Sequence, residues 1–454
     1  MLTLVIYALA ALLALLPTRL AGVVMPVIFL GQRILFPEPE EDLLRLGSMR
    51  ISLVDVFSAT LVLKWLAGGG LLRLREQDRG IRYVLGAWAA VNFLACLAAG
   101  LKFGDAHAYA CIASLARGLG EAILVVVLAD SFTSLRQART VALAILGFLG
   151  VLLAIQFFNY AGADRGWVIG EVQGLERDQV RIFGPVGDSV GFILLLGYVY
   201  GLCRENLIVA AAFAGGIVVT AGLGAVISMA VATAFYLVAR PYLAAAAPRR
   251  GAAPLLLGLG LAAAAALVWT TPLTATLRER LSGAYEESGG QRALTARVAL
   301  TMVDDNFWTG VGFMGFRHLV MRYGGSDYFG YDAADGGTAN ANNQALQSLT
   351  DAGIPGIVAL AALIFVAARL LYRVAHRAGD PVLAAFFSAV MLWLLAQAFG
   401  NLAATWLTPS SGVALLLWIS LGTAAGVQRL IVLEEEKADA RPSASAPQLL
   451  GVAP

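Results

Sequence analysis

The chain has 454 residues, of which 59% are hydrophobic and 14% are charged, and its mean hydropathy is +0.76. Since a soluble domain carries about 25% charged residues, this composition indicates an integral membrane protein. The net charge of +2, without a basic stripe interleaved with aromatic residues, argues against nucleic-acid binding. The three cysteines lie in or beside apolar runs, and neither Cys-x-x-Cys nor His-x-x-x-His spacing occurs, so we expect no disulfide, no metal site and no cofactor.

Apolar runs of about 20 residues, the length that crosses a bilayer, recur along the chain. They predict an all-α polytopic membrane bundle of about twelve transmembrane helices with one large, partly helical extracytoplasmic loop. The first run, residues 2–36, lacks a basic start and a cleavage site, so it resembles a membrane segment rather than a removed signal peptide. Because Pro17 to Arg19 interrupt this run, it forms either one broken span or a helical hairpin. The remaining spans are expected at residues 51–70, 83–103, 109–130, 140–161, 186–203, 206–220, 222–239, 253–272, 353–375, 381–400 and 412–432.

These runs divide the chain into four parts. Residues 1–272 form a transmembrane bundle, residues 273–352 the large loop, residues 353–432 the last three spans, and residues 433–454 a polar tail that we expect to be disordered. Arginines collect in four connections that fall on one side if the spans alternate, namely 73–82, 136–139, 240–250 and 369–377. The positive-inside rule makes that side cytoplasmic. The large loop and residues 163–185 are then extracytoplasmic, and the tail is cytoplasmic.

The large loop has the composition of a folded segment. It contains aromatic residues to bury, whereas disordered segments are poor in them: Phe307, Trp308, Phe313, Phe316, Tyr323, Tyr328 and Phe329. Within RVALTMVDDNFW, a helical period brings Val298, Met302 and Trp308 to one face, which predicts a docked helix. The following TGVGFMGF has neither the preceding strand nor the spacing of a phosphate-binding loop, so we interpret it as a tight turn.

A second extracytoplasmic segment, ERDQVRIFGPVGDSVG, is rich in arginine just before a span. A guanidinium suits phosphate or carboxylate, because it stays charged and binds both oxygens. Arg177, Arg181 and Asp188 are therefore candidate substrate-site residues. For Arg177 we favour a structural role, in which it reaches the headgroups or pairs with Glu176 or Asp188, whereas for Arg181 the family resemblance described below favours ligand contact.

Polar side chains in the large loop offer further candidates. His318 is the loop's one histidine and could act as a general base, although a locally hydrogen-bonded histidine is the simpler interpretation. Amides precede the helix that carries LQSLTDAG, and capping explains one of them but not all four: Asn340, Asn342, Asn343 and Gln344.

Taken in order, these pieces resemble the O-antigen ligase and O-antigen polymerase superfamily over residues 181–356. RIFGPVGDSVGF resembles an Arg-x-x-Gly element that opens a middle span, and TAGLGAVISMAVA resembles the Thr-x-Ser-Arg-Gly-Ala span. RVALTMVDDNFWTGVGFMGF resembles the Arg-led loop helix and Gly-x-Gly turn, while NNQALQSLTDAGIPG resembles the His-Asn element that leads to Gly-x-x-Gly.

The resemblance implies a metal-independent glycosyltransferase of the C type that acts at the periplasmic face of the bacterial inner membrane. Its donor would be an undecaprenyl-diphosphate-linked glycan, with Arg181 and Arg297 holding the diphosphate. The chain departs from the ligase pattern where Ser-Arg is Gly222-Leu223 and where the His of His-Asn is Asn342. Asparagine is not a useful base, so the proton acceptor would be another group, or the chain has lost the reaction; the available groups are His318, Asp304, Asp305 and Glu171.

We therefore expect a polymerase that joins lipid-linked repeat units of a surface or secreted polysaccharide. The alternative is a divergent ligase that transfers glycan to a lipid or protein acceptor. A lipid-glycan transporter is a third class, but it predicts charges in the middle of spans, where Lys64 and Arg117 are the nearest examples. Besides the donor, the expected partners are a glycan or lipid acceptor, membrane lipids, a flippase and a chain-length regulator.

Overall fold

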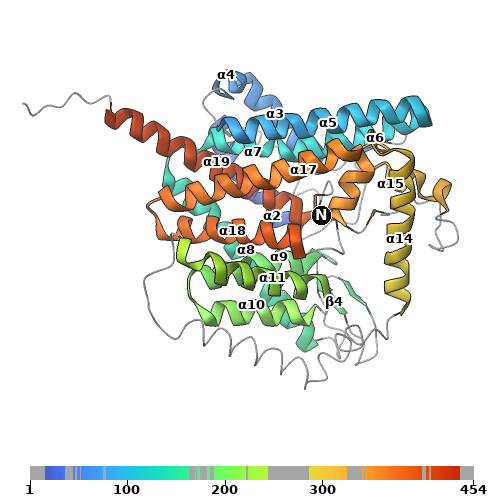
Figure 1. Cartoon of the computed structure of the whole chain (residues 1–454). Helices are drawn as coiled ribbons and strands as arrows, with labels where there is room; N and C mark the ends of the chain where they lie inside the picture. The colour runs from blue at the N-terminus through green and yellow to red at the C-terminus, as the bar shows by residue number, and fades with distance from the viewer. Residues whose placement is uncertain are drawn as a thin grey trace, which may run out of the picture.

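The computed structural model describes residues 16–35, 44–46, 49–51, 53–74, 78–162, 169, 171–173, 181–184, 189–220, 223–243, 286–324, 340–341, 343–400, 405–407 and 411–439. Helices dominate these residues (Figure 1). They are α2 (Thr18–Leu35), α3 (Leu53–Ala67), α4 (Gly70–Arg73), α5 (Arg79–Phe103), α6 (Asp105–Ala122), α7 (Leu124–Ser131), α8 (Leu135–Gly162), α9 (Val190–Cys203), α10 (Leu207–Val219), α11 (Leu223–Ala239), η4 (Arg240–Tyr242), α14 (Glu286–Asp305), α15 (Phe316–Leu319), η6 (Val320–Tyr323), α17 (Gln344–Arg377), α18 (Pro381–Gly400) and α19 (Gly412–Asp439).

Two short antiparallel strand pairs accompany the helices, and the sequence patterns do not predict them. β1 (Leu44–Leu46) pairs with β2 (Met49–Ile51), and β3 (Glu171–Gln173) pairs with β4 (Arg181–Gly184). With three or four residues each, these strands are too short for the alternating pattern that identifies a strand in sequence. The helical architecture is otherwise as expected.

In the part of the chain that the structure describes, seven helical segments are long and apolar enough to cross a bilayer: Arg79–Phe103, Asp105–Ser131, Leu135–Gly162, Gly224–Tyr242, Gln344–Arg377, Pro381–Phe399 and Gly412–Asp439. The chain is thus a multi-pass membrane protein. α9 and α10 are apolar but have only 14 and 13 residues, which makes each roughly 20 Å long. The span expected at 253–272 lies outside the described residues, so the structure gives seven candidate spans rather than the expected count of about twelve.

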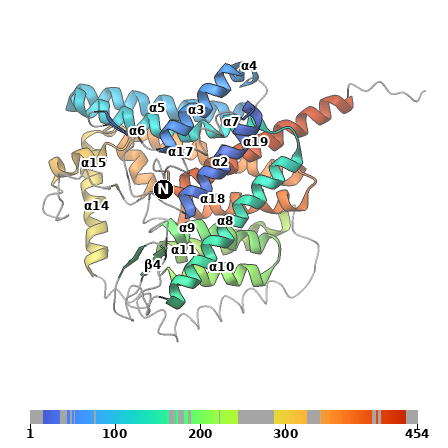
Figure 2. The same ribbon diagram turned by 180° about the vertical axis from the view of Figure 1, so that it is seen from behind.

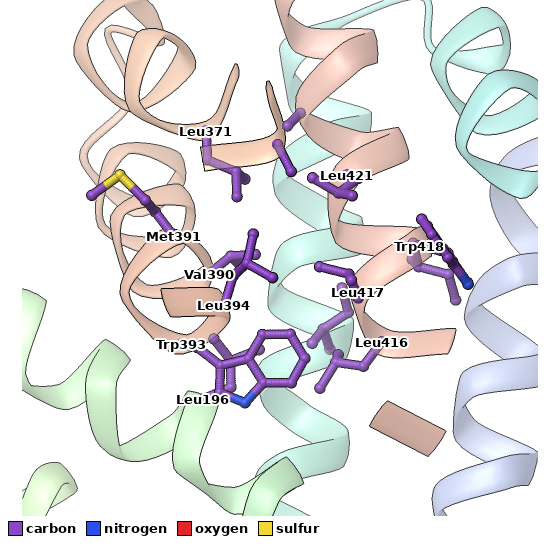
Figure 3. Packing of buried hydrophobic residues seen from close by; sticks show 14 of the residues in the cluster. Leu196, Leu371, Val390, Met391, Trp393, Leu394, Leu416, Leu417, Trp418 and Leu421 are labelled. Carbon is purple, nitrogen blue, oxygen red and sulfur yellow. The ribbon is translucent and has the colours of Figure 1, made fainter. Parts of the chain in front are cut away.

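The centre of the bundle is built by α18 and α19, whose apolar residues cover all sides of the helix. Such helices must be surrounded by protein or lipid, and here α17, α9 and α11 pack around α18 while α7 and α17 pack against α19. Figure 3 shows Leu371, Val390, Leu394 and Leu417 meeting between α17, α18 and α19. The indole of Trp393 donates a hydrogen bond to the carbonyl of Phe192 at 2.8 Å, which fixes α18 to α9.

Ion pairs gather at one end of the bundle, which we call the ionic end. They join residues at or near helix termini: Arg139 with Asp380, Arg240 with Glu205, Arg373 with Asp78, and Arg377 with Glu435. Glu435 lies on α19, which continues to Asp439. This helix therefore extends into the segment that was expected to be disordered from residue 433. The arginines of this end are those that predicted a cytoplasmic side.

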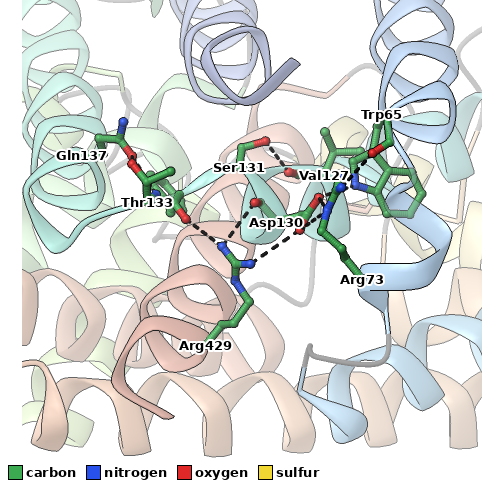
Figure 4. Close-up of polar contacts among 10 residues, drawn as sticks. Trp65, Arg73, Val127, Asp130, Ser131, Thr133, Gln137 and Arg429 are labelled. Atoms are coloured by element: carbon green, nitrogen blue, oxygen red, sulfur yellow. Dashed lines mark hydrogen bonds and ion pairs between the residues drawn. The ribbon is translucent and has the colours of Figure 1, made fainter. Parts of the chain in front are cut away.

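Asp130 forms a buried charge cluster near the same end (Figure 4). Its carboxylate accepts hydrogen bonds from Arg73 at 2.7 Å and from the indole of Trp65 at 3.0 Å. Arg429 of α19 lies 3.5 Å from the same carboxylate and also donates to the carbonyls of Asp130 and Phe132. Buried charges are tolerated when they are paired in this way, and the sequence patterns did not reveal this pairing.

The opposite end of the bundle, which we call the loop end, carries α14, α15 and the first turns of α17. Figures 1 and 2 show α14 at one end of the bundle, running roughly crosswise to the long helices α5 and α17. α14 packs against α17 and η6. The folded part of the large loop therefore covers one end of the bundle.

Candidate active site at the loop end

α14 is the docked helix that the apolar period predicts. Val298 and Met302 are buried on one face, together with Ala299 and Val303, against the cluster formed by Val311, Phe316, Leu319 and Val320. Arg297 lies on the exposed side of the same helix. Trp308, which was expected on the buried face, follows the helix and is 69% exposed, so that part of the expectation is wrong.

The loop aromatics divide into two groups. Phe313 and Phe316 are buried, as a folded loop requires, whereas Phe307 is 44% exposed and stacks edge-on against the exposed Trp308 at 5.3 Å. Tyr328 and Phe329 lie outside the described residues. The described part of the loop is thus folded, but an aromatic pair remains at its surface.

A cation fixes the C-terminal end of α14. The ammonium of Lys102, at the end of α5, donates to the carbonyl of Asp305 at 2.9 Å and to the side-chain oxygen of Asn306 at 2.8 Å. Unpaired carbonyls at a helix C-terminus favour a positive charge. Lys102 therefore joins the loop helix to the transmembrane bundle.

The glycine-rich turn that follows α14 makes backbone contact with α17. Gly310 and Gly312 have φ of +66° and +90°, values that favour glycine because it lacks a Cβ. The N–H of Val311 donates to Thr350 at 2.8 Å, and the N–H of Gly312 donates to Asp351 at 2.9 Å. A side chain at Gly310 would overlap the carbonyl of Asp351. The segment is therefore a tight turn, as predicted, and its glycines serve close backbone packing.

A kink in α17 makes these contacts available. Ala352 and Gly353 have non-helical backbone angles, with φ of +62° at Gly353, and Pro355 has no N–H to continue the helical pattern. The carbonyls of Thr350 and Asp351 thus accept from the loop, while the N–H of Ile354 donates to Phe307 at 3.0 Å. The kink falls at the expected boundary between loop and span.

The start of α17 is held by its amide side chains. Asn343 caps the helix, because its side-chain oxygen accepts the N–H of Leu346 at 2.9 Å. Gln344 accepts the N–H groups of Trp406 and Leu407 at 3.0 and 2.8 Å, so it ties the helix to the segment before α19. Capping accordingly explains one of the four amides, and Gln344 has a different structural task.

Asp351 has a buried carboxyl group that no sequence motif indicated. It accepts a hydrogen bond from the amide of Gln347 at 2.7 Å and one from the backbone N–H of Met314. The side-chain oxygen of Gln347 in turn accepts the N–H of Ala341 at 2.8 Å. One chain of hydrogen bonds therefore runs from the glycine-rich turn through Asp351 to the residue just before Asn342. The sequence feature that could have indicated this group is an acidic residue two positions before Gly353.

A narrow polar cavity lies beside Asp351. Its volume of about 10 Å³ holds about one water molecule, which is too small for a sugar. It is lined by Trp88, Asn92, Phe313, Met314, Gln344, Gln347, Ser348, Asp351, Gly356 and Leu407. This cavity belongs to the support of the loop rather than to a substrate pocket.

His318 lies against α6. Its ring stacks edge-on against His107 at 6.0 Å, and its Nε2 accepts a hydrogen bond from Nε of Arg317 at 3.2 Å. Desolvation of the ring, the charge of Arg317 and the neighbouring His107 lower the pKa of His318 to about 4. The ring is thus neutral near pH 7, but a nitrogen lone pair is already engaged by Arg317. This geometry disfavours His318 as a general base.

The other candidates are placed only in part. Arg181 begins β4, where it pairs with Gln173; Arg177, Asp188 and Asn342 lie outside the described residues. Asp304 and Asp305 are exposed at the end of α14. Arg297, Asn343 and His318 thus share the loop end. Among the described residues, no three His, Cys, Asp or Glu side chains gather as metal ligands would.

A comparison with known protein families gives a match. Residues 208–361 match the family described as O-antigen ligase, a stretch that includes α14, the glycine-rich turn and the kink of α17. Arg181 precedes the matched stretch. No curated protein matches the chain. The match confirms the resemblance to the O-antigen ligase and polymerase superfamily that the motifs indicate.

Proposed function

We propose that the chain, whose residues 208–361 match the family described as O-antigen ligase, is a glycosyltransferase of the C type that polymerises undecaprenyl-diphosphate-linked repeat units. The observation that carries the proposal is that the matched stretch includes the docked loop helix and the kinked first part of α17 at the loop end. The loop end is then the catalytic face, and the product is a surface or secreted polysaccharide.

The proposed chemistry needs positive charge at the leaving group. An acceptor hydroxyl attacks the anomeric carbon of the donor glycan, the bond from that carbon to the diphosphate oxygen breaks, and the diphosphate leaves with the added negative charge. Fixed cations aimed at this charge stabilise the transition state. Arg297, which is exposed on α14, and Arg181 are proposed to supply them without a metal ion, with Arg177 and Asp188 near the donor.

The proton of the acceptor hydroxyl needs a separate acceptor. Arg317 donates to Nε2 of His318, so His318 would first have to lose that bond. Asp304 and Asp305, which are exposed on the last turn of α14, are alternative proton acceptors on the same helix as Arg297. Glu171 on β3 is a third alternative. Asn342 and Asn343 are proposed to orient sugar hydroxyls rather than to take a proton, and the N-terminus of α17 beside them favours an anionic group.

A ligase is the second candidate, since the matched family is described as O-antigen ligase. A ligase would transfer the glycan once to a lipid or protein acceptor, whereas a polymerase would extend it repeatedly. The test is to supply the purified chain with a lipid-linked repeat unit alone and then with a lipid acceptor. A ladder of products from the donor alone supports the polymerase, and a single product that requires the acceptor supports the ligase.

The same preparation separates glycan transfer from transport. A transporter would move the lipid-linked repeat unit across vesicles without forming a glycosidic bond. Ladder formation that persists in a metal chelator supports metal-independent transfer. Movement of the donor with no new glycosidic bond would overturn the proposal.

The proposed location is the inner membrane, with the loop end in the periplasm. Since Cys96, Cys111 and Cys203 are buried, a cysteine introduced as Ser326→Cys should dominate labelling by an impermeant thiol reagent. We expect labelling in cells whose outer membrane alone is permeable. Labelling only after the inner membrane is breached would reverse the orientation.

A further inference from the structure

An open, apolar groove runs between α5 and the junction of α6 with α7, far from the loop end along α5. Its volume is about 300 Å³, at the lower limit of small-molecule sites. All but one of its lining residues are apolar: Leu74, Arg82, Leu85, Gly86, Leu119, Ala122, Ile123 and Val126. In Figures 1 and 2 these helices form one edge of the molecule, so the groove belongs to an outer layer of the bundle.

The single charge in this groove is Arg82, in the first turn of α5. Its Nε atom is buried and has no hydrogen-bond partner, and its guanidinium lies 5.8 Å from the ring centre of Tyr83. The nearest acidic group along the helix, Asp78, is already engaged, since it accepts from Arg373 at 3.0 Å and from the N–H of Ile81 at 3.1 Å. A buried donor without a partner is unfavourable, so the site suits an added anion.

The position of Arg82 identifies the kind of anion. Arg82 lies at the ionic end of α5, where Asp78 and Arg373 form an ion pair, while Leu85 and Gly86 lie one turn further along the helix. Because α5 is long and apolar enough to cross a bilayer, lipid phosphates are expected beside its first turn and acyl chains beside the next turns. Basic pockets between membrane helices bind anionic headgroups in this way.

We propose that the groove binds one anionic phospholipid of the leaflet at the ionic end, with its phosphate at Arg82 and one acyl chain along Leu85, Gly86 and Ala122. The proposal is independent of glycan transfer at the loop end. A bound lipid would cover the exposed apolar wall of the groove and place an anion beside the guanidinium of Arg82.

Gly86 provides a way to close the groove without disturbing the bundle. A Cβ built on Gly86 meets no atom within 4 Å, so a leucine there would extend into open space. Leucine also favours a helix more than glycine does. Gly86→Leu should therefore fold and occupy the volume of the proposed acyl chain.

The charge can be tested separately with a matched control. Arg82→Gln removes the cation at the groove. Arg79→Gln removes an exposed arginine from the same turn that does not line the groove. If the groove binds the lipid, the first substitution and Gly86→Leu should act alike, and the control should behave as the natural chain.

The experiment uses the full chain reconstituted in vesicles of phosphatidylcholine with a tenth of phosphatidylglycerol, followed by mild extraction and native mass spectrometry. We expect one phosphatidylglycerol retained per natural chain and per Arg79→Gln chain, and at least fivefold less on Arg82→Gln and on Gly86→Leu. The rise in the thermal midpoint on adding phosphatidylglycerol should likewise be larger for the natural chain and Arg79→Gln than for Arg82→Gln and Gly86→Leu.

Three results would overturn the proposal. Equal retention by Arg82→Gln and Arg79→Gln would remove the role of the cation. Undiminished retention by a folded Gly86→Leu chain would place the lipid elsewhere. Preferential retention of a polyprenyl phosphate over phosphatidylglycerol at Arg82 would replace the phospholipid with the carrier lipid.

Discussion

The backbone N–H of Gly312 donates to the carbonyl of Asp351 at 2.9 Å, so the glycine-rich turn of the loop and the kink of α17 form one unit. The two glycine motifs of the sequence are thus complementary. The turn supplies N–H groups, and the kink supplies the carbonyls that a continuous helix would have used. This unit determines where α14 and the start of α17 lie.

Gly310→Ala should separate the loop from α17. The left-handed backbone alone costs a non-glycine residue about 1–2 kcal/mol, and the new Cβ would also overlap the carbonyl of Asp351. Gly324→Ala is the matched control, because its φ is +86° but no atom lies within 4 Å of its Cβ. We expect a larger fall in the thermal midpoint and in glycan transfer for Gly310→Ala. Equal effects of the two substitutions would mean that the contact with α17 contributes nothing.

Arg297 should matter for transfer and not for stability. It is exposed on α14, and surface substitutions usually change stability by less than about 0.5 kcal/mol. If it binds the diphosphate in a bidentate manner, Arg297→Lys should lose nearly as much as Arg297→Ala, because lysine cannot supply the fork. A charge-assisted bond of roughly 1.5–3 kcal/mol corresponds to a loss of about 10- to 150-fold in kcat/KM.

Arg322→Lys serves as the comparison for Arg297, since Arg322 is another exposed loop arginine, which lies over the ring of Phe103. We expect transfer by this variant to stay near that of the natural chain. The same lysine test applies to Arg181. Full transfer by Arg297→Lys and Arg181→Lys would remove the proposed roles of both arginines.

Hydrophobic runs predicted the helices of this chain better than they predicted its polar contacts. The span expected at 381–400 is α18 (Pro381–Gly400), and the span expected at 83–103 lies within α5 (Arg79–Phe103). The reason is physical, because a bilayer demands a minimum apolar length that sequence displays directly. The expected span at 353 instead begins as a helix at Gln344, since polar residues continued the helix beyond the apolar run.

The pairing of Asp130 with Arg73 and Arg429 could not be predicted in the same way. These residues are 57 and 299 positions apart from Asp130, and nothing local in sequence indicates which distant helix supplies a partner. Asp351 was missed for a similar reason, as its partner Met314 comes from another element. The position of Arg297 on the exposed face could be predicted, because it follows from the helical period of α14 alone.

His318 should make stability depend on pH. Its folded-state pKa of about 4 lies below the ordinary value of about 6.5, so between these values the unfolded chain binds more protons than the folded one. The stabilisation from the neutral ring is complete above pH 6.5 and is lost as the pH falls toward 4. Between pH 7.5 and 4.5, the thermal midpoint should fall further for the natural chain than for His318→Gln. Parallel curves would contradict this account.

Asn343 and Asn342 should separate stability from transfer. Asn343 caps α17, so Asn343→Ala should destabilise the chain by about 1 kcal/mol and Asn343→Asp should restore the cap. Asn342→Ala should reduce transfer with an unchanged thermal midpoint, if its amide orients a sugar. Asn342→His tests whether a base at this position raises transfer. A silent Asn342→Ala would show that the site assigned from the family pattern fails at this position.

Asp351 should position the loop end through Gln347. Asp351→Ala leaves the buried donors of Gln347 and Met314 without their acceptor, which costs roughly 1–3 kcal/mol for each group. It also frees the Gln347 amide that holds the N–H of Ala341, so we expect kcat to fall more than KM changes. Ser348→Ala, at the same cavity, is the control and should stay within about 0.5 kcal/mol.

A double-mutant cycle separates this hydrogen-bonded chain from two independent contacts. Because Asp351 and Gln347 are joined directly at 2.7 Å, the losses from Asp351→Ala and Gln347→Ala should overlap, with a coupling energy of about 0.5–3 kcal/mol. The coupling should appear both in the free energy of unfolding and in kcat. Coupling in unfolding without coupling in kcat would assign Asp351 to folding alone. Additive losses in both would show that the start of α17 is held by Asn343 and Gln344 without help from Asp351.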